Sequence, residues 1–417
     1  MTVACEKSVS KRSAWRKVAR SATPALAGVV AMLECPRHHD ANHGPAVSDG
    51  LSAGLGPNTG APVMAATPPA FNAAPSVVGS FPHTTADQLV DDVLGRFRQL
   101  PAWPQLPARD WRESMYVQYS EGLPGAVIDN EAQRIYFQKG PAFESALEQF
   151  YQAVVEEQVD RFAVSRDYAL GLHLFLDKLQ QTNPNGRRWV KGQVTGPFSF
   201  AMTVTDEAKR SLAYTPDLHE VATQGMAMKA RWMARRLREV SQGALVVLDE
   251  PYLCSFGSAF VNVSREDVIA AIDAAIAAIH TEGALAGIHC CGNTDWSLVF
   301  STQVDVVNFD AYAYFHGIPL YPDHLRSFLD RGGILSWGIV PASATGDDLD
   351  PATLVRMLDD RVGQLVGKGM DRARIYHQAI LTPSCGMGTQ SVEGATRVVD
   401  ALIRLAELIQ EREGLQC

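Results

Sequence analysis

Short apolar runs alternate along the chain with longer segments in which apolar residues recur at helical spacing, beginning near Pro75. The runs are rich in β-branched residues and lie at 76–81, 189–194, 244–248, 285–290, 304–309, 334–339 and 374–380. The segments of helical period lie at 86–100, 142–163, 166–181, 217–240, 265–281, 321–331, 351–368 and 392–410. Strands that alternate with helices of this length indicate parallel βα units covered by helices. The pattern predicts an α/β fold, a (β/α)8 TIM barrel over residues 75–417, rather than an open Rossmann sheet, since no Gly-rich nucleotide-binding motif is present.

Residues 1–74 differ from the rest in composition. Basic residues outnumber acidic ones there, and the part from 42 onward is rich in Gly, Pro, Ala, Ser and Asn. Such a composition buries too little apolar surface to offset the entropy lost on ordering, so we expect a disordered or loosely ordered extension. Basic residues before the apolar stretch 22–33 resemble a secretory signal, but no small-x-small cleavage site follows. A dispensable tail and a true start at Met64 are the other interpretations.

Net charge and cysteine content indicate which partners and which cellular compartment to expect. The net charge of −9 gives no reason to expect a nucleic-acid partner, and no apolar run reaches the roughly 18 residues of a membrane-spanning helix. The seven cysteines are an odd, irregularly spaced set with two adjacent members, which argues against a disulfide framework and for a reducing compartment. We therefore expect a cytoplasmic protein with no nucleic-acid and no membrane partner.

Polar and metal-capable residues follow the apolar runs. Barrels of this type carry their active sites at the C-terminal ends of the strands, so residues in these positions are candidates for a common site. They are Ser80 and His83 after the first run, Asp249 and Glu250, His289 and Cys291, Asp310, and Cys385.

His289 and Cys291 have the spacing of two side chains on one face of a strand. A neutral imidazole and a thiolate side by side suit Zn²⁺, although a His-x-Cys pair alone is a weak motif. Cys290 is expected to face the other side of the strand and to pack in the core. Cys385, nearly a hundred positions later, is the candidate that would complete the site.

Four segments resemble the catalytic C-terminal barrel of cobalamin-independent methionine synthase, of the short core type. This family lies within a superfamily that also contains uroporphyrinogen decarboxylase. The resemblance runs from about Val77 to the end of the chain. The segments are Val-Gly-Ser-Phe-Pro-His-Thr at 78–84, Lys-Gly-Gln-Val-Thr-Gly-Pro at 191–197, Asp-Glu-Pro at 249–251, and His-x-Cys at 289–291 with Pro-x-Cys-Gly at 383–386.

The resemblance implies a zinc enzyme that methylates homocysteine. It makes His289, Cys291 and Cys385 zinc ligands, and it places Asp310 where the family has a ligating glutamate, one methylene longer. It also implies that Asp249 holds the ammonium group of homocysteine. The carboxylate of the substrate would be received at Gly79 and Ser80.

The residues that bind folate polyglutamate in the family have no clear counterparts here. The positions that would carry its tryptophan, acidic residue and histidine fall in 201–204, 254–255 and 338–343. We therefore expect the methyl donor to be a methylated corrinoid, carried by a partner protein, rather than folate polyglutamate.

Three other functions are alternatives to this reaction. A decarboxylase of the uroporphyrinogen type would need an arginine-rich cleft, which we do not find, and would leave His289, Cys291 and Cys385 without a purpose. A non-catalytic barrel that carries zinc or corrinoid is disfavoured by the retained substrate residues Ser80 and Asp249. A methyltransferase that acts on another small thiol is the third alternative, because barrels of the resembled superfamily also methylate other thiols. Metal content and homocysteine-dependent demethylation of methylcobalamin distinguish these functions.

Overall fold

A computed structural model describes residues 69–182, 189–343 and 346–415, nearly all of which belong to one compact unit, residues 65–154 and 158–417. Of the predicted extension 1–74, residues 1–68, which include Met64, lie outside the described residues. Residues 69–74 are described and lead into β1, with Phe71 and Ala73 buried. The strands are β1 (Ala74–Pro75), β2 (Ala126–Asp129), β3 (Arg134–Phe137), β4 (Trp189–Thr195), β5 (Gly243–Asp249), β6 (Leu285–Cys290), β7 (Val306–Phe309), β8 (Ile334–Val340) and β9 (Ala379–Pro383). The helices are α3 (Asp87–Arg96), α4 (Met115–Gln118), α5 (Phe143–Val155), α6 (Leu170–Gln181), α7 (Pro197–Thr203), α8 (Pro216–Glu239), α9 (Arg265–Thr281), α10 (Trp296–Ser301), α11 (Pro322–Asp330), α12 (Pro351–Val366), α13 (Arg372–His377) and α14 (Val392–Glu413).

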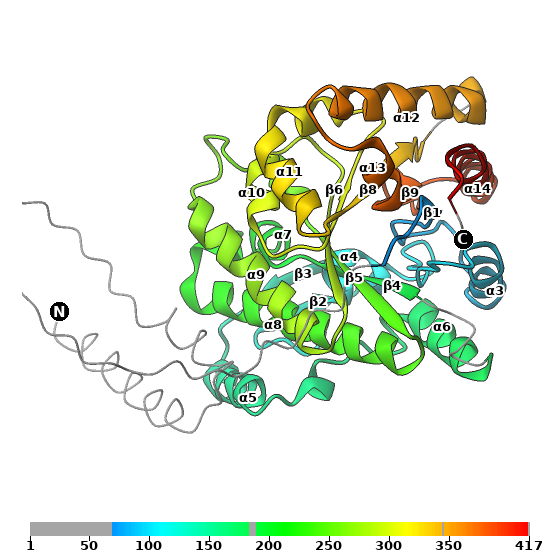
Figure 1. Cartoon of the computed structure of the whole chain (residues 1–417). Helices are drawn as coiled ribbons and strands as arrows, with labels where there is room; N and C mark the ends of the chain where they lie inside the picture. The colour runs from blue at the N-terminus through cyan, green and yellow to red at the C-terminus, as the bar shows by residue number, and fades with distance from the viewer. Residues whose placement is uncertain (1–68, 183–188, 344–345, 416–417) are drawn as a thin grey trace, which may run out of the picture. The chain divides into compact units, whose positions relative to one another are not determined.

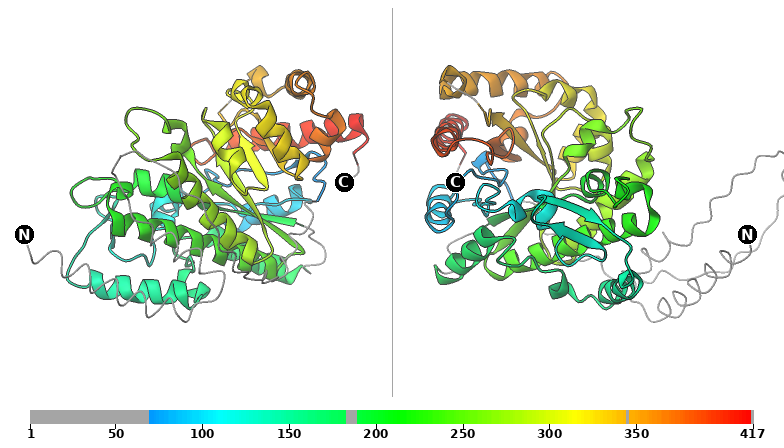
Figure 2. Two further views of the ribbon diagram at one scale, coloured as in Figure 1. Left: turned by 60° about the vertical axis from the view of Figure 1, so that its left-hand side comes forward. Right: turned by 180° about the vertical axis from the view of Figure 1, so that it is seen from behind.

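Seven of the strands form one parallel sheet in the order β1-β9-β8-β7-β6-β5-β4, and β2 and β3 form a separate antiparallel hairpin. The first strand pairs with the last, so the two ends of the barrel sequence lie side by side. Figure 1 shows the strands at the centre with the long helices around them, and Figure 2 shows the same arrangement from two further directions. Helix α8, the longest in the part of the chain that the structure describes, packs against β4 and β5.

An irregular segment, residues 101–105, lies between the first strand and β4 and closes the sheet into a ring. Gln105 N donates to Gly79 O at 3.0 Å on one side, and Trp103 N donates to Lys191 O at 3.2 Å on the other. Parallel bridges on both sides accompany these bonds. The segment takes the eighth position of the ring, so the chain is a (β/α)8 barrel, as its alternating pattern predicts.

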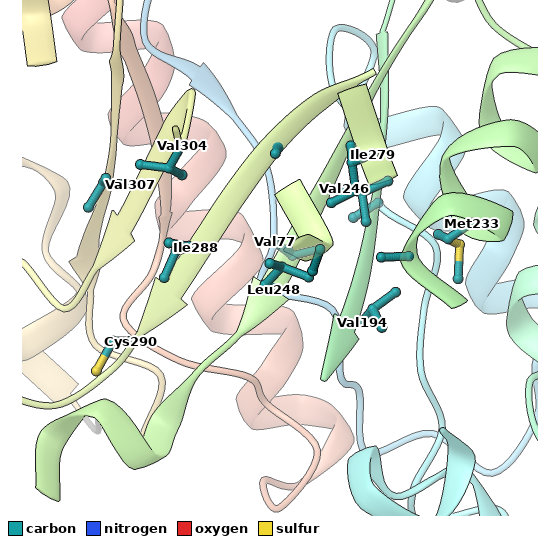
Figure 3. Close-up of a cluster of buried hydrophobic side chains, with 14 of the residues drawn as sticks. Val77, Val194, Met233, Val246, Leu248, Ile279, Ile288, Cys290, Val304 and Val307 are labelled. Carbon is teal, nitrogen blue, oxygen red and sulfur yellow. The ribbon is translucent and has the colours of Figure 1, made fainter. Parts of the chain in front are cut away.

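Two apolar cores result from the alternation of side chains along the strands. One lies inside the ring and includes Leu245, Leu285 and Val306, which close the N-terminal end of the barrel. The other lies between the strands and the helices. Figure 3 shows this outer core with side chains from β4 to β7 together with Met233 of α8 and Ile279 of α9. Cys290 belongs to it, as predicted.

Several elements differ from the sequence prediction. The first strand, expected at 76–81, is β1 at Ala74–Pro75, with Ser80 in an isolated bridge to Gln105, and the hairpin β2–β3 was not predicted. The run 374–380 was expected to be a strand, but helix α13 occupies Arg372–His377 and strand β9 begins at Ala379. The reason is an N-cap, because the Asp371 side chain accepts a hydrogen bond from Arg374 N and starts a helical turn. The segment 142–163 was expected to be one helix, but α5 ends at Val155 and a separate 3-10 turn, Val159–Phe162, follows.

No helix among residues 69–415 that the structure describes has the length and apolar character needed to span a bilayer.

Candidate metal centre

Strands β6 and β9 bring three predicted ligands to the C-terminal end of the barrel. His289 is on β6, and Cys291 is the first residue after the end of that strand. Cys385 lies two residues beyond the end of β9. Two strands, β7 and β8, separate β6 from β9 in the ring. Cys385 therefore approaches His289 and Cys291 from across two strands of the barrel wall, although almost a hundred residues separate it from them in sequence.

The donor atoms of His289, Cys291 and Cys385 all lie within 4.8 Å of one another. Around a tetrahedral zinc ion with Zn–N near 2.0 Å and Zn–S near 2.3 Å, ligand atoms are roughly 3.5 to 3.8 Å apart. A modest contraction would therefore give a coordination sphere. His289 is 4% exposed, and its Nδ1 atom is buried without a hydrogen-bond partner. An imidazole and two thiols, with one buried ring nitrogen unpaired, fit a soft divalent metal such as zinc.

The three groups perturb one another strongly. Hydrogen bonding from the Cys291 thiol lowers the pKa of Cys385, in spite of burial, and His289 adds to this effect. The same hydrogen bond raises the pKa of Cys291. Burial by itself lowers the pKa of His289, but its contacts with Cys385 and Asp249 outweigh burial and raise it. The Cys291–Cys385 pair therefore readily loses one proton to give a thiolate, the form that binds metals.

Asp310, the fourth predicted ligand, is not among the three converging groups. It directly follows β7, it is 8% exposed, and its Oδ1 accepts a hydrogen bond of 2.7 Å from Ala313 N. Burial raises its pKa, and the nearby Cys385 acts in the same direction. The Asp310 carboxylate thus lies close enough to Cys385 for that residue to affect its pKa, while its Oδ1 is hydrogen-bonded within the turn 310–313.

Asp249, the predicted ammonium-binding residue, ends β5 beside His289 of β6 in the strand register. Its Oδ1 is buried and has no hydrogen-bond partner. Burial raises the pKa of Asp249 to about 6, and the positive charges of His289 and Lys191 moderate this rise. A buried acceptor without a donor is costly, so this oxygen is suited to receive a donor group from a ligand.

Gly79 and Ser80, the predicted carboxylate-binding residues, lie on the extension of the first strand. Gly79 has φ of +150°, and a Cβ there would lie 2.2 Å from Gln193 Nε2, so this position admits only glycine. Lys191 Nζ donates to Val78 O at 2.6 Å, which fixes the same stretch from inside the ring. Ser80 contacts the loop after Cys385, where its Oγ accepts from Gly388 N at 3.3 Å.

Glu250 is a supporting residue whose role the sequence pattern alone did not reveal. It is fully buried, and its carboxylate accepts hydrogen bonds from Phe198 N, Ser199 N and Ser199 Oγ at the start of α7. A Cβ on Gly196 would lie 2.1 Å from Glu250 Oε1. The Asp-Glu-Pro and Thr-Gly-Pro segments are therefore packed together, and the glycine at position 196 leaves room for the Glu250 carboxylate.

Tyr116 and Thr195 also lie at the C-terminal end of the barrel, which we call the barrel mouth. Tyr116 of α4 was not selected from the sequence. Its hydroxyl accepts a hydrogen bond from Thr203 Oγ1 at 3.2 Å. Its pKa is raised mainly by burial, and the charges of Glu250, Asp249 and Cys291 add to the rise. Thr195 Oγ1 donates to Met115 O at 2.7 Å and holds α4 there. His83, in contrast, lies in a crevice with Asp92 of α3 and Val399 of α14.

Comparison with known proteins gives likenesses in structure, of which three follow. No protein-family model and no curated protein matches the chain. A candidate vitamin-B12-independent methionine synthase from Listeria monocytogenes is 15% identical, with 79% of this chain and 86% of that chain covered and a TM-score of 0.45. A psychrophilic family 10 endo-β-1,4-xylanase is 11% identical, with 53% and 72% covered and a TM-score of 0.31. The 3-keto-D-glucoside 4-epimerase from E. coli is 11% identical, with 62% and 93% covered and a TM-score of 0.31. Likenesses this distant carry no information about activity.

Proposed function

We propose that this chain is a zinc-dependent methyltransferase whose acceptor is a small thiol, with homocysteine as the acceptor and a methylated corrinoid as the donor. The observation that carries the proposal is the approach of His289, Cys291 and Cys385 to within 4.8 Å, beside the unpaired Asp249 Oδ1. The sequence resemblance to the short methionine synthases supports the same reaction. The acceptor and donor follow from that resemblance and from the missing folate-binding residues.

The residues of the barrel mouth have complementary tasks in this reaction. A zinc ion held by His289, Cys291 and Cys385 would supply the Lewis acidity that keeps an acceptor thiol deprotonated at neutral pH. Asp249 receives the ammonium group of the acceptor through its unpaired oxygen. Below the site the barrel interior is filled by buried side chains. Asn308, which donates to Ser336 Oγ and Thr382 Oγ1, lies nearer the site, and the apolar core lies beyond it.

Methyl transfer itself needs alignment more than further chemistry. The acceptor thiol loses its proton, its sulfur forms a bond to the methyl carbon, and the bond from that carbon to the donor breaks with its electron pair left on the donor. Fixing the sulfur opposite the donor accounts for a large part of such catalysis. The ends of β5, β6 and β9 provide a rigid frame for this alignment, and Asp310 is available as a fourth ligand if its turn opens.

Metal analysis with a donor screen tests the proposal. We expect about one zinc per chain, and homocysteine-dependent demethylation of methylcobalamin. Cys385→Ser should lose most of the zinc and the activity while the barrel still folds. Cys254→Ser, which changes an exposed thiol in a neighbouring loop, is the matched control and should retain both.

Each part of the proposal has a result that contradicts it. Full zinc content in Cys385→Ser would remove the ligand assignment. Rapid turnover with methylfolate and none with methylcobalamin would rule out the corrinoid donor. Zinc binding without methyl transfer to any thiol would leave a carrier, and a zinc-free active protein would point back to a decarboxylase.

A further inference from the structure

The loop that carries Cys385 is attached through Ser80 to the segment that extends β1. Met387 N donates to Ser80 O at 2.9 Å, and Gly388 N donates to Ser80 Oγ at 3.3 Å. The first strand is the ring neighbour of β9, so these bonds continue the strand pairing beyond the end of β9. We call residues 385–388 the Cys385 loop.

Both glycines of the Cys385 loop are in close contact with Ser80. A Cβ on Gly386 would lie 2.2 Å from Ser80 Oγ, and a Cβ on Gly388 would lie 3.2 Å from Ser80 Cβ and 2.8 Å from Pro107 Cγ. Distances below 3 Å require the neighbouring atoms to move. The backbone of the loop therefore lies directly on the serine side chain, and a larger residue at either position requires Ser80 or Pro107 to shift.

We infer that Ser80 is a positioning residue that holds the Cys385 thiol in the metal-binding arrangement, through its two hydrogen bonds to the Cys385 loop. This rests on the proposed function, in which Cys385 is a metal ligand. It assigns Ser80 a task besides the carboxylate binding that the sequence resemblance implies. The two tasks are compatible, because Ser80 Oγ accepts from Gly388 N and still has its own hydrogen to donate.

The test uses single and double variants at the two contacting positions of the full-length chain. Ser80→Ala removes the hydroxyl acceptor. Gly386→Ala places a methyl group against that hydroxyl. In the double variant the new methyl group faces Ser80 Cβ at 3.4 Å, which is ordinary contact. Gly95→Ala, in α3 with no atom within 4 Å of the added Cβ, is the matched control.

Zinc affinity, measured by chelator competition without substrate, is the principal readout. Loss of a group that orients a metal ligand costs about 10- to 100-fold in affinity. We expect Ser80→Ala to bind zinc about tenfold more weakly, Gly386→Ala more weakly still, and the double variant to recover to the level of Ser80→Ala. Gly95→Ala should match the wild type. If Ser80 served the substrate alone, Ser80→Ala would raise KM for the thiol and leave zinc affinity unchanged.

Thiol labelling of the metal-free protein gives a second readout that needs no metal. Cys385 should be alkylated several-fold faster in Ser80→Ala than in the wild type, with the exposed Cys254 as internal reference. Unchanged zinc affinity together with unchanged labelling would overturn the inference, whether or not the protein transfers methyl groups. A wild type that binds zinc but transfers no methyl group would contradict the proposed reaction and leave this inference intact. If the wild type binds no zinc, the labelling rates alone decide it.

Discussion

At the residue scale, two adjacent cysteines have opposite surroundings. Cys290 is fully buried among the apolar side chains between the strands and the helices, and burial raises its pKa to about 12. Cys291 is half-buried and lies with His289 and Cys385. The alternation of side chains along β6 separates a packing thiol from a candidate ligand by one peptide unit.

This contrast leads to a paired prediction. Cys291→Ser should abolish tight zinc binding, because serine is a poor ligand for zinc, and should leave the fold intact. Cys290→Ser should keep the zinc but lower the free energy of unfolding by about 1–3 kcal/mol, because it buries a hydroxyl in an apolar site. Zinc content and urea unfolding of both variants measure the two effects. Equal zinc loss in the two variants would show that both thiols serve the metal.

Asp249 supports a second residue-scale prediction. Asp249→Asn retains the shape of the side chain but removes the negative charge that would pair with the acceptor ammonium. We expect zinc content to be unchanged and kcat/KM for homocysteine to fall by more than about a hundredfold, because a buried charge pair is worth several kcal/mol. For an acceptor thiol without an ammonium group, kcat/KM should fall much less. If kcat/KM fell equally for the two acceptors, Asp249 would act on the metal site instead.

The sequence located the three clustered residues because strand ends and two-residue spacing are local properties. The turn at Asp310 was not predictable in the same way, since the hydrogen bond from Ala313 N depends on the course of the loop after β7. The contact between Ser80 and the Cys385 loop joins residues more than three hundred positions apart, and no local pattern marks it.

At the scale of elements, one carboxylate connects three helices on the outside of the barrel. Asp359 of α12 accepts hydrogen bonds from Arg372 Nη2 and Tyr376 Oη of α13 and from Arg412 Nη2 of α14, at 3.0, 2.9 and 2.7 Å. Burial tends to raise the pKa of Asp359, but these hydrogen bonds outweigh burial and lower it. The group is therefore more acidic in the folded protein than in the unfolded chain.

A lowered pKa fixes the sign of the pH dependence. The stabilisation from Asp359 is present above the unfolded-state pKa, near 4, and is lost as the pH falls through the folded-state pKa. Asp359→Asn should lower the free energy of unfolding by about 1–2 kcal/mol at pH 7. The difference from wild type should be constant between pH 7 and 5 and should shrink below about pH 4. Asp323→Asn, whose side chain is 89% exposed, is the control and should have almost no effect. A difference that grows on acidification would contradict the assignment.

Element boundaries show where the periodic pattern fails. The residues Ile375 and Tyr376 look like part of a strand, but the cap at Asp371 makes them helical. The segment 101–105 was not recognised as part of the ring because two of its residues are proline and its bonding is irregular. Its place depends on backbone hydrogen bonds to Gly79 and Lys191, which only the closed ring brings near.

At the scale of the whole molecule, the proposed metal would connect distant parts of the barrel wall. His289 and Cys291 belong to the end of β6 and Cys385 to the end of β9, with β7 and β8 between them in the ring. A metal bound to all three would brace one arc of the ring from inside. A ligand that binds only the folded state stabilises it. Once the free ligand concentration exceeds the dissociation constant, the stabilisation grows with the logarithm of their ratio.

We therefore expect the melting temperature to rise steadily with free zinc in a buffered series. A free zinc concentration one hundred times the dissociation constant should add about 2.7 kcal/mol to the free energy of unfolding. Cys385→Ser should abolish the dependence on zinc because the metal would no longer reach β9. Cys290→Ser should melt at a lower temperature yet keep the same slope, since its defect lies in the outer core. A slope retained in Cys385→Ser would mean that the metal binds on β6 alone and does not join the two strands.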